Sequence, residues 1–141
     1  MHAIDIPSAL VFQALADPIR IRMLHLLTTA REEACLCEFV DSLLEPQYKL
    51  SRHLKILRQA GLLSAQKDGR FVYHRLVPGI DHLTKLYAVL RALPDDRAKF
   101  AADLRRFKAR MRLRESGRCR IGIQVASLAG EQPEQRSRRT A

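Results

Sequence analysis

The sequence has no tryptophan, only 6% aromatic residues and no apolar run long enough to cross a bilayer. Its first residues also lack the basic segment and apolar stretch that form a secretory signal. We therefore expect a cytoplasmic protein that has no membrane partner. A reducing compartment disfavours structural disulfides, which leaves metal binding, redox sensing or inert burial for the three cysteines.

A glycine-rich phosphate loop, a nucleophile motif and the Cys-x-x-Cys pair of thiol reductases are all missing, so we do not expect an enzyme. Positive charge is plentiful instead. The net charge is +10, and residues 91–141 hold 14 Lys and Arg against 6 Asp and Glu, a net charge of +8. Such an excess favours polyanions such as nucleic acid. The alternative is a solvated basic tail, which we prefer for the last dozen residues.

Hydrophobic periodicity predicts a series of short helices interrupted by one β-hairpin. Asp17 and Pro18 suit a helix N-cap and first helical position, whereas Gly61 ends a helix that opens at Pro46. The predicted elements are helices at 8–16, 18–28, 35–44, 46–60 and 80–93, a hairpin at 62–76 and an Arg-rich helical segment at 94–114.

This order predicts a mainly α fold with a β-hairpin wing, namely a dimeric winged helix-turn-helix. Asp68-Gly69 is a type I′ signal for the hairpin turn. We divide the chain into a winged-helix DNA-binding and dimerisation domain (1–93), an Arg-rich helical C-terminal extension that contains Cys119 (94–129) and a disordered tail (130–141).

The helix at 80–93 carries an apolar stripe that we interpret as the seam of a homodimer. Leu10, Val11 and Leu15 of the first helix could pack beside it. A two-fold dimer would present two recognition helices about one DNA turn apart. The stripe consists of Ile80, Leu83, Leu86, Tyr87, Leu90 and Leu93.

The helix that opens at Pro46 is the predicted recognition helix, and double-stranded operator DNA is the predicted partner. Its N-terminal half should reach base edges in the major groove, and its lysines should meet phosphates. Arg52 suits either a guanine edge or a phosphate, whereas His53 has a packing or capping role at least as readily as a base contact. The candidate DNA-binding residues are Gln47, Tyr48, Lys49, Ser51, Arg52 and Lys55, with Arg58 as a further phosphate contact and Lys67 and Arg70 beside the hairpin turn.

Cys35 and Cys37 lie about ten residues before that helix. Thiolates are soft ligands that suit thiophilic ions, although a lone Cys-x-Cys is a weak motif. Residues i and i+2 point to different faces of a regular helix. The pair can therefore share an ion only if the helix is locally unwound or if the cysteines occupy its first turn. The alternative is two buried small hydrophobes.

The chain resembles the ArsR/SmtB family of metal- and metalloid-responsive repressors over residues 8–93. The resemblance lies in Ala14-Leu-Ala-Asp-Pro-Ile-Arg-Ile-Arg-Met-Leu, in Leu50-Ser-Arg-His-Leu-Lys-Ile-Leu-Arg-Gln-Ala-Gly-Leu-Leu and in Asp68-Gly-Arg-Phe-Val-Tyr-His-Arg-Leu. Cys35-Leu-Cys37-Glu-Phe resembles the third-helix site of arsenic repressors. The resemblance implies an apo dimer, without a cofactor, that leaves its operator when As(III) or Sb(III) binds the cysteines.

Two positions depart from the family pattern. Val40 stands where arsenic repressors have a third cysteine, and Pro46 stands where a serine often caps the recognition helix. Since the family pattern implies three sulfurs, we name Cys35, Cys37 and Cys119 as metal ligands, with Cys119 supplied by the same chain or by the partner. The alternative for Cys119 is a residue of a mobile tail that has no role in the site. Asp81-His82 lacks the spaced partner of the last-helix zinc site of some relatives, so we do not predict that site.

The sequence therefore predicts a metalloid-responsive transcriptional repressor. The first alternative is a related repressor that responds to redox or to another thiophilic metal, or that binds no metal. Binding of nucleic acid without sequence choice is the second.

Overall fold

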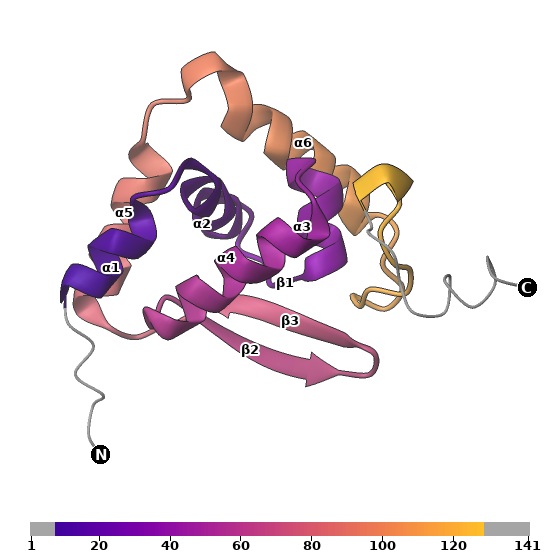
Figure 1. Cartoon of the computed structure of the whole chain (residues 1–141), viewed down its shortest axis with the longest axis horizontal. Coiled ribbons are helices and arrows are strands. Elements are labelled where there is room, and N and C mark those ends of the chain that lie inside the picture. The colour runs from indigo at the N-terminus through magenta and orange to yellow at the C-terminus, as the bar shows by residue number, and fades with distance from the viewer. Residues whose placement is uncertain (1–7, 129–141) are drawn as a thin grey trace, which may run out of the picture.

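The computed structural model describes residues 8–128, and it has the predicted mainly α architecture with a hairpin wing (Figure 1). The predicted tail at 130–141 lies outside these residues. The helices are α1 (Ser8–Leu15), α2 (Pro18–Ala30), α3 (Leu36–Leu43), α4 (Gln47–Gln59), α5 (Asp81–Ala92) and α6 (Lys99–Met111), with short 3₁₀ turns η1 (Asp96–Ala98) and η2 (Ala126–Leu128). The strands are β1 (Ala34–Cys35), β2 (Leu63–Asp68) and β3 (Phe71–Leu76).

The helix-turn-helix is formed by α3 and α4, which are joined by a tight turn in which Leu44 has a φ of 55°. α4 buries Leu50, Leu54 and Leu57 against the core, as their helical spacing predicts. Pro46 provides an extended N-cap residue without any side-chain capping bond. The face of α4 opposite Leu50, Leu54 and Leu57 is left to solvent and is available to a partner.

The wing differs from the prediction at its turn. Asp68 pairs directly with Phe71, so the two central turn residues are Gly69 and Arg70 rather than Asp68 and Gly69. Of these two, only Gly69 has a positive φ, +64°. A type I′ turn needs positive φ at both central positions, whereas a type II′ turn needs it only at the first. The predicted type I′ turn at Asp68-Gly69 is therefore wrong in both type and position: the turn lies at Gly69-Arg70 and has the positive φ that type II′ requires.

β1 was not predicted. Ala34 and Cys35 pair with His74 and Tyr73 of β3, which completes an antiparallel sheet in the order β1-β3-β2. Cys35 is consequently extended and caps α3 instead of starting it. The third helix thus begins one residue later than the sequence suggests, and the sheet fixes the backbone of the first cysteine.

The apolar stripe of α5 faces the core of its own chain. Leu83, Tyr87 and Leu90 are buried, and α5 packs along α2. The stripe predicted as a dimer seam is thus largely an intramolecular contact. The apolar surface that α1 and α5 leave exposed includes Phe12 and Val89, beside Leu86 of the stripe.

α6 packs lengthwise against α3 and also touches α2, and its Phe107 lies in the same buried cluster as the winged-helix core. The contact between α3 and α6 is unusually polar. Arg106, Arg110 and Arg114 follow one another at four-residue intervals and meet α3 along its length. These three arginines, which add to the basic charge of residues 91–141, are therefore engaged inside the chain.

The last of these three arginines, Arg114, pairs with Glu38 of α3. The Glu38 side chain is fully buried and accepts two hydrogen bonds of 2.8 Å from Arg114. Burial raises the pKa of Glu38, but the Arg114 guanidinium and the Cys35 backbone N–H hold it below its ordinary value overall.

None of the helices within residues 8–128 has the length and apolar character needed to cross a bilayer.

Arg114→Met should destabilise the fold by about 3–5 kcal/mol, because it leaves the Glu38 carboxylate buried without its ionic partner. Urea unfolding measures this cost. Arg105→Met is the matched control, since Arg105 is exposed on α6, the helix that precedes Arg114. A loss below about 1 kcal/mol, as expected for an exposed pair, would contradict a structural role for Arg114.

Candidate thiol site and DNA-binding surface

The three cysteine sulfurs lie together in one buried cluster. The Sγ atoms of Cys35 and Cys37 are 3.0 Å apart, those of Cys37 and Cys119 are 3.5 Å apart, and all three lie within 4.8 Å of one another. The exposed fractions are 1%, 7% and 2% for Cys35, Cys37 and Cys119. Of the two geometries open to Cys-x-Cys, the structure uses the helix start: Cys35 is the N-cap and Cys37 lies in the first turn of α3.

Cys119 comes from the same chain, after a turn that follows α6. Its backbone N–H donates to the Tyr73 hydroxyl at 2.8 Å. The Arg118 guanidinium lies 4.6 Å from the centre of the Tyr73 ring and pairs with Glu33 and Asp68. Residues far apart in the sequence therefore hold this thiol beside the other two, without the partner subunit.

The electrostatic environment divides the thiols into two kinds. Hydrogen bonding from Cys35 lowers the pKa of Cys37 to about 7; bonding to Cys119 and the nearby Arg110 charge act in the same direction, against burial. The bond to Cys37, together with burial, raises the pKa of Cys35. Burial also raises the pKa of Cys119. The site therefore holds one thiolate most readily and keeps the other two sulfurs protonated.

The donor set selects soft ions. Three sulfurs and no imidazole or carboxylate make up this group, and soft thiolates favour thiophilic ions over hard oxygen-seeking ones. Within residues 8–128 it is the one such group of potential ligands. Val40, where a third cysteine was expected from the family pattern, is fully buried in the core instead.

The candidate DNA-binding residues lie mainly on the exposed faces of α4 and the wing. Gln47 and Lys49 are half-buried, and Lys49 lies 3.8 Å from Glu45. Arg70 lies over the ring of Phe71 and reaches the Arg120 carbonyl at 3.5 Å. The exposed members of the set are Tyr48, Ser51, Arg52, Lys55, Lys67 and Arg70.

Two further residues of this surface are engaged inside the chain. His53 is half-buried, with its Nδ1 3.0 Å from Arg20 and its Nε2 3.9 Å from Asp17, which favours the packing interpretation. Arg58 lies 2.6 Å from Nε2 of the buried His74. This contact joins the recognition helix to the wing.

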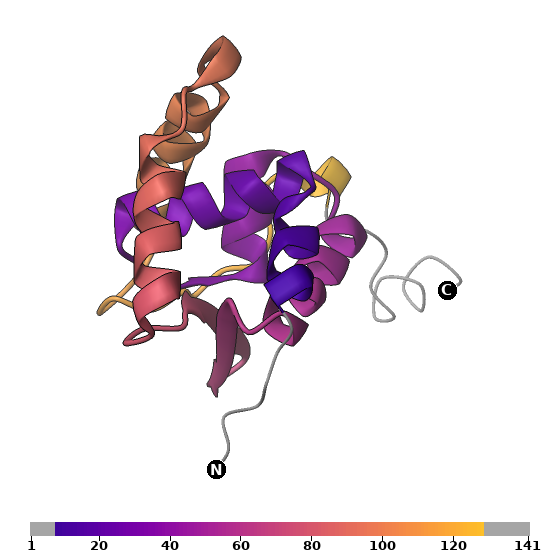
Figure 2. The ribbon, with the colours of Figure 1, turned by 90° about the vertical axis from the view of Figure 1, so that its left-hand side faces the viewer.

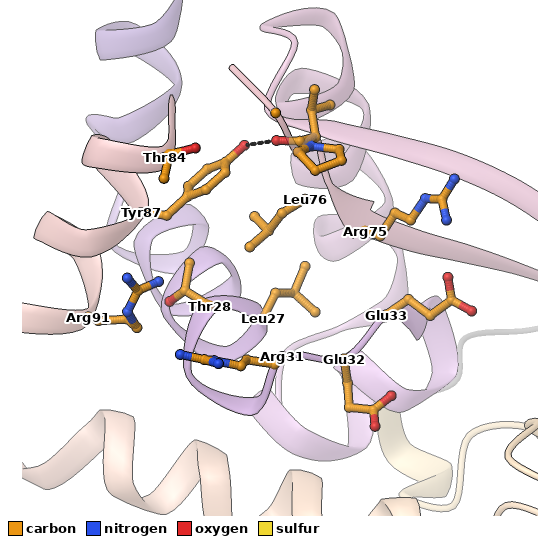
Figure 3. Close-up of a pocket in the computed structure, with 13 residues that line it drawn as sticks. Leu27, Thr28, Arg31, Glu32, Glu33, Arg75, Leu76, Thr84, Tyr87 and Arg91 are labelled. Atoms are coloured by element: carbon orange, nitrogen blue, oxygen red, sulfur yellow. Dashed lines mark hydrogen bonds between the residues drawn. The ribbon is translucent and has the colours of Figure 1, made fainter. Parts of the chain in front are cut away.

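A hollow lies between α2, the end of β3 and α5, away from the thiol cluster and from the candidate DNA-binding surface (Figure 3). Leu27, Leu76 and Tyr87 line it, and arginines stand at its rim. The Tyr87 hydroxyl is already bonded to the carbonyls of Val77 and Leu62. No predicted site residue lines this hollow, so it does not compete with the thiol cluster as the candidate site.

The fold and the exposed helix define a winged-helix transcriptional regulator, and comparison with known proteins gives its family. Residues 17–65 match the model of bacterial regulatory proteins of the arsR family. The chain is 47% identical over 72 residues to the arsenic resistance transcriptional regulator ArsR1 of Pseudomonas putida, covering 50% of this chain and 55% of that one. It is 41% identical over 70 residues to the arsenical resistance operon repressor of Escherichia coli, covering 50% and 59%.

An uncharacterized HTH-type transcriptional regulator of Methanocaldococcus jannaschii is 37% identical over 70 residues, which is 50% of this chain and 78% of that protein. The chain belongs to the ArsR/SmtB family of transcriptional repressors, whose regulators bind operator DNA. It matches only a little over half the length of the two named arsenic regulators.

Sequence reasoning missed the residues that position the thiols. Asp41 and Arg110 are buried partners at 2.7 Å, and an Arg110 Nη atom lies 3.8 Å from the Cys119 sulfur. A signal was present in the sequence. Arg110 and Arg114 are four residues apart, and their partners Asp41 and Glu38 are three apart, which is the spacing of side chains on one face of a helix. Without knowing that α6 packs on α3, this match could not be separated from ordinary surface charge.

His74 should make stability fall as the pH drops from about 6.5 to 4. Burial, assisted by the Arg58 charge, lowers the pKa of His74 to about 4. The unfolded chain therefore binds a proton in this window that the folded chain refuses, at a cost of ~3 kcal/mol by pH 4. In urea unfolding across this range, His74→Gln should flatten the pH dependence by about that amount.

The control is His82→Gln, since His82 is exposed on α5. It should retain the wild-type slope. A His74→Gln slope equal to that of the wild type would show that the buried imidazole is not the titrating group.

Proposed function

We propose that the chain is a metalloid-responsive repressor that binds operator DNA as an apo homodimer and releases it when trivalent arsenic or antimony binds Cys35, Cys37 and Cys119. The observation that carries this proposal is the convergence of three buried sulfurs, drawn from the start of α3 and from the segment after α6. The naming of two relatives for arsenic resistance supports the same ligand.

The chemistry is a ligand exchange at arsenic. Arsenous acid, As(OH)₃, exchanges its three hydroxyls for three cysteine sulfurs, and each exchange releases one water made from the hydroxyl and a thiol proton. Cys37, the most acidic thiol, is suited to attack first because the thiolate is the nucleophile. Cys35 and Cys119 follow from within 4.8 Å.

DNA binding would use α4 in the major groove and the wing beside it. Tyr48, Ser51 and Arg52 lie on the exposed face of α4, and Lys67 and Arg70 flank the tip of the wing. One chain can meet only one half-site, so a homodimer is part of the proposal.

The surface that best fits this dimer is the apolar end formed by α1 and α5. The exposed fractions of Phe12 and Val89 are 66% and 57%, and both line a hollow with Val11 and Leu86. An apolar surface of this kind favours association with a second copy.

A second candidate is a thiol redox switch, favoured by the 3.0 Å separation of the Cys35 and Cys37 sulfurs. A peroxide would oxidise the pair to a disulfide and would itself be reduced to water. Release of DNA by peroxide but not by arsenite would favour this function over the first.

Cys35→Ser/Cys37→Ser should abolish release of operator DNA by arsenite, because only one sulfur remains. Cys119→Ser should lower the arsenic–sulfur coordination number from three to two in X-ray absorption. The matched control is Ser116→Ala, close to Cys119 in the same segment. Release by arsenite from the double variant would overturn the site assignment.

Val89→Glu should weaken dimerisation and operator binding together, because it places a charge in the apolar surface between α1 and α5. Analytical ultracentrifugation and operator titration measure the two effects. Thr84→Glu adds the same charge to an exposed position of α5 outside that hollow. If both variants stay dimeric, the proposed dimer surface is incorrect.

A further inference from the structure

The segment that follows Cys119 returns across α3 to the beginning of the recognition helix. We call residues 121–128 the C-terminal arm. In Figures 1 and 2 its last turn, η2, lies beside the end of α4 that follows α3. Ile123 and Leu128 are half-buried against the core. The thiol site and the DNA-binding helix are therefore connected by one short stretch of chain.

Buried polar groups hold the arm in place. Asp41 of α3 accepts hydrogen bonds from the backbone N–H groups of Gln124 and Val125 at 3.0 and 3.1 Å. Arg110 donates to the carbonyls of Ile121 and Gly122 at 2.8 and 3.0 Å. Asp41 and Arg110 also pair with each other, so one buried ion pair binds the arm both before and after Ile123.

The arm borders the half of α4 that was predicted to read DNA. Ser127 and Leu128 share a hollow with Gln47, Tyr48 and Ser51. Gly122 and Ile123 line another hollow, between the arm, α4 and the wing, together with Gln47, Ser51 and other residues of the wing and α3. Gln47 and Ser51 thus face the arm on two sides, so a duplex seated on this half of α4 would compete with the arm for space.

The charge of the arm argues against an additional DNA contact. Residues 121–128, Ile-Gly-Ile-Gln-Val-Ala-Ser-Leu, contain no lysine or arginine. DNA affinity comes mainly from cationic side chains that replace counterions on phosphates. An uncharged segment in this position would occupy the groove-facing surface without adding to that affinity.

We propose that the C-terminal arm is an autoinhibitory mask that the occupied thiol site holds over the N-terminal half of the recognition helix. This inference rests on the proposed function and names the means by which ligand binding is converted into DNA release. In the DNA-bound state the arm moves away from Gln47, Tyr48 and Ser51. In the ligand-bound state it stays beside them, as in this structure, and blocks the approach of a duplex.

The coupling follows from the position of Cys119, five residues before Gln124. Arsenic bonded to Cys119, to Cys37 of α3 and to its N-cap residue Cys35 ties the arm to the helix on which it docks. Tethering raises the effective concentration of the arm at Asp41 and shifts the equilibrium toward the masked state. The ligand then favours the state that cannot bind DNA, which is the requirement for release.

The test removes the two backbone donors of the arm while leaving all three cysteines intact. Gln124→Pro/Val125→Pro eliminates both N–H groups that bond Asp41, whereas the control Gln124→Ala/Val125→Ala retains them. Operator dissociation constants are measured for full-length proteins, without arsenite and with arsenite at a concentration that saturates each protein. Binding of the ligand-free proline variant to the operator shows that it is folded.

Arsenite should weaken operator binding of the wild type and of the alanine control by about 5- to 150-fold, the usual range of allosteric coupling. For the proline variant, the ratio of the two dissociation constants should fall close to one although arsenite still binds. A proline variant that binds arsenite and leaves the operator as the alanine control does would overturn the mask.

Failure of the proposed function has a different signature, because arsenite would then leave the wild-type affinity unchanged. The mask is still tested in that case by the two ligand-free variants. Tighter operator binding by the proline variant than by the alanine control supports it, and equal affinities overturn it.

Discussion

The buried ion pair between Asp41 and Arg110 is the contact on which the functional half of the molecule depends. It joins α3 to α6, and both partners also form hydrogen bonds with the segment after Cys119. A buried pair of this kind adds little net stability compared with apolar packing, but leaving one partner alone is costly. It therefore acts chiefly on geometry, by admitting one register of α6 against α3 and hence one position for the third thiol.

That geometry also places the thiol cluster a short distance from the start of α4, since Cys35, Cys37, Gln47 and Ser51 line one hollow. Cys35 and Cys37 lie at the first turn of α3, whose other end leads through Leu44 directly into α4. No unwinding of α3 is needed to bring the sulfurs together, because the pair occupies the cap and the first turn. Of the two ways in which a Cys-x-Cys pair can share an ion, the structure thus uses the one that leaves α3 regular.

The sequence was sufficient for the elements whose signals are local. Apolar periodicity predicted α4 and its buried leucines, and Asp17-Pro18 predicted the start of α2, where the Asp17 carboxylate does accept from the N–H groups of Ile19 and Arg20. The features that depend on long-range pairing were missed. β1 is only two residues long and exists because β3 passes beside it. The distances between Cys119 and the other thiols follow from the α3–α6 contact, and the spacing of the arginines indicates that contact only once the packing of α6 on α3 is known. For the same reason the α5 stripe was assigned to a partner when α2 covers it.

The same contact changes what the net charge of +10 means. Arg110 and Arg114 are buried against carboxylates, and Arg106 is bonded to Asp103 and to a carbonyl of α3. These cations stabilise the fold and contribute little to an external field. The cations exposed on α4 and the wing, among them Arg52, Lys55 and Lys67, belong instead to the matched family region or its adjoining hairpin. A uniform basic tail would bind any polyanion in proportion to its charge. Arg106, Arg110 and Arg114 are paired inside the chain, whereas Arg105 and Lys108 stay exposed on α6. Internal pairing therefore weakens the field of this half of the chain without removing it, and the uncharged arm beside α4 adds nothing to that field.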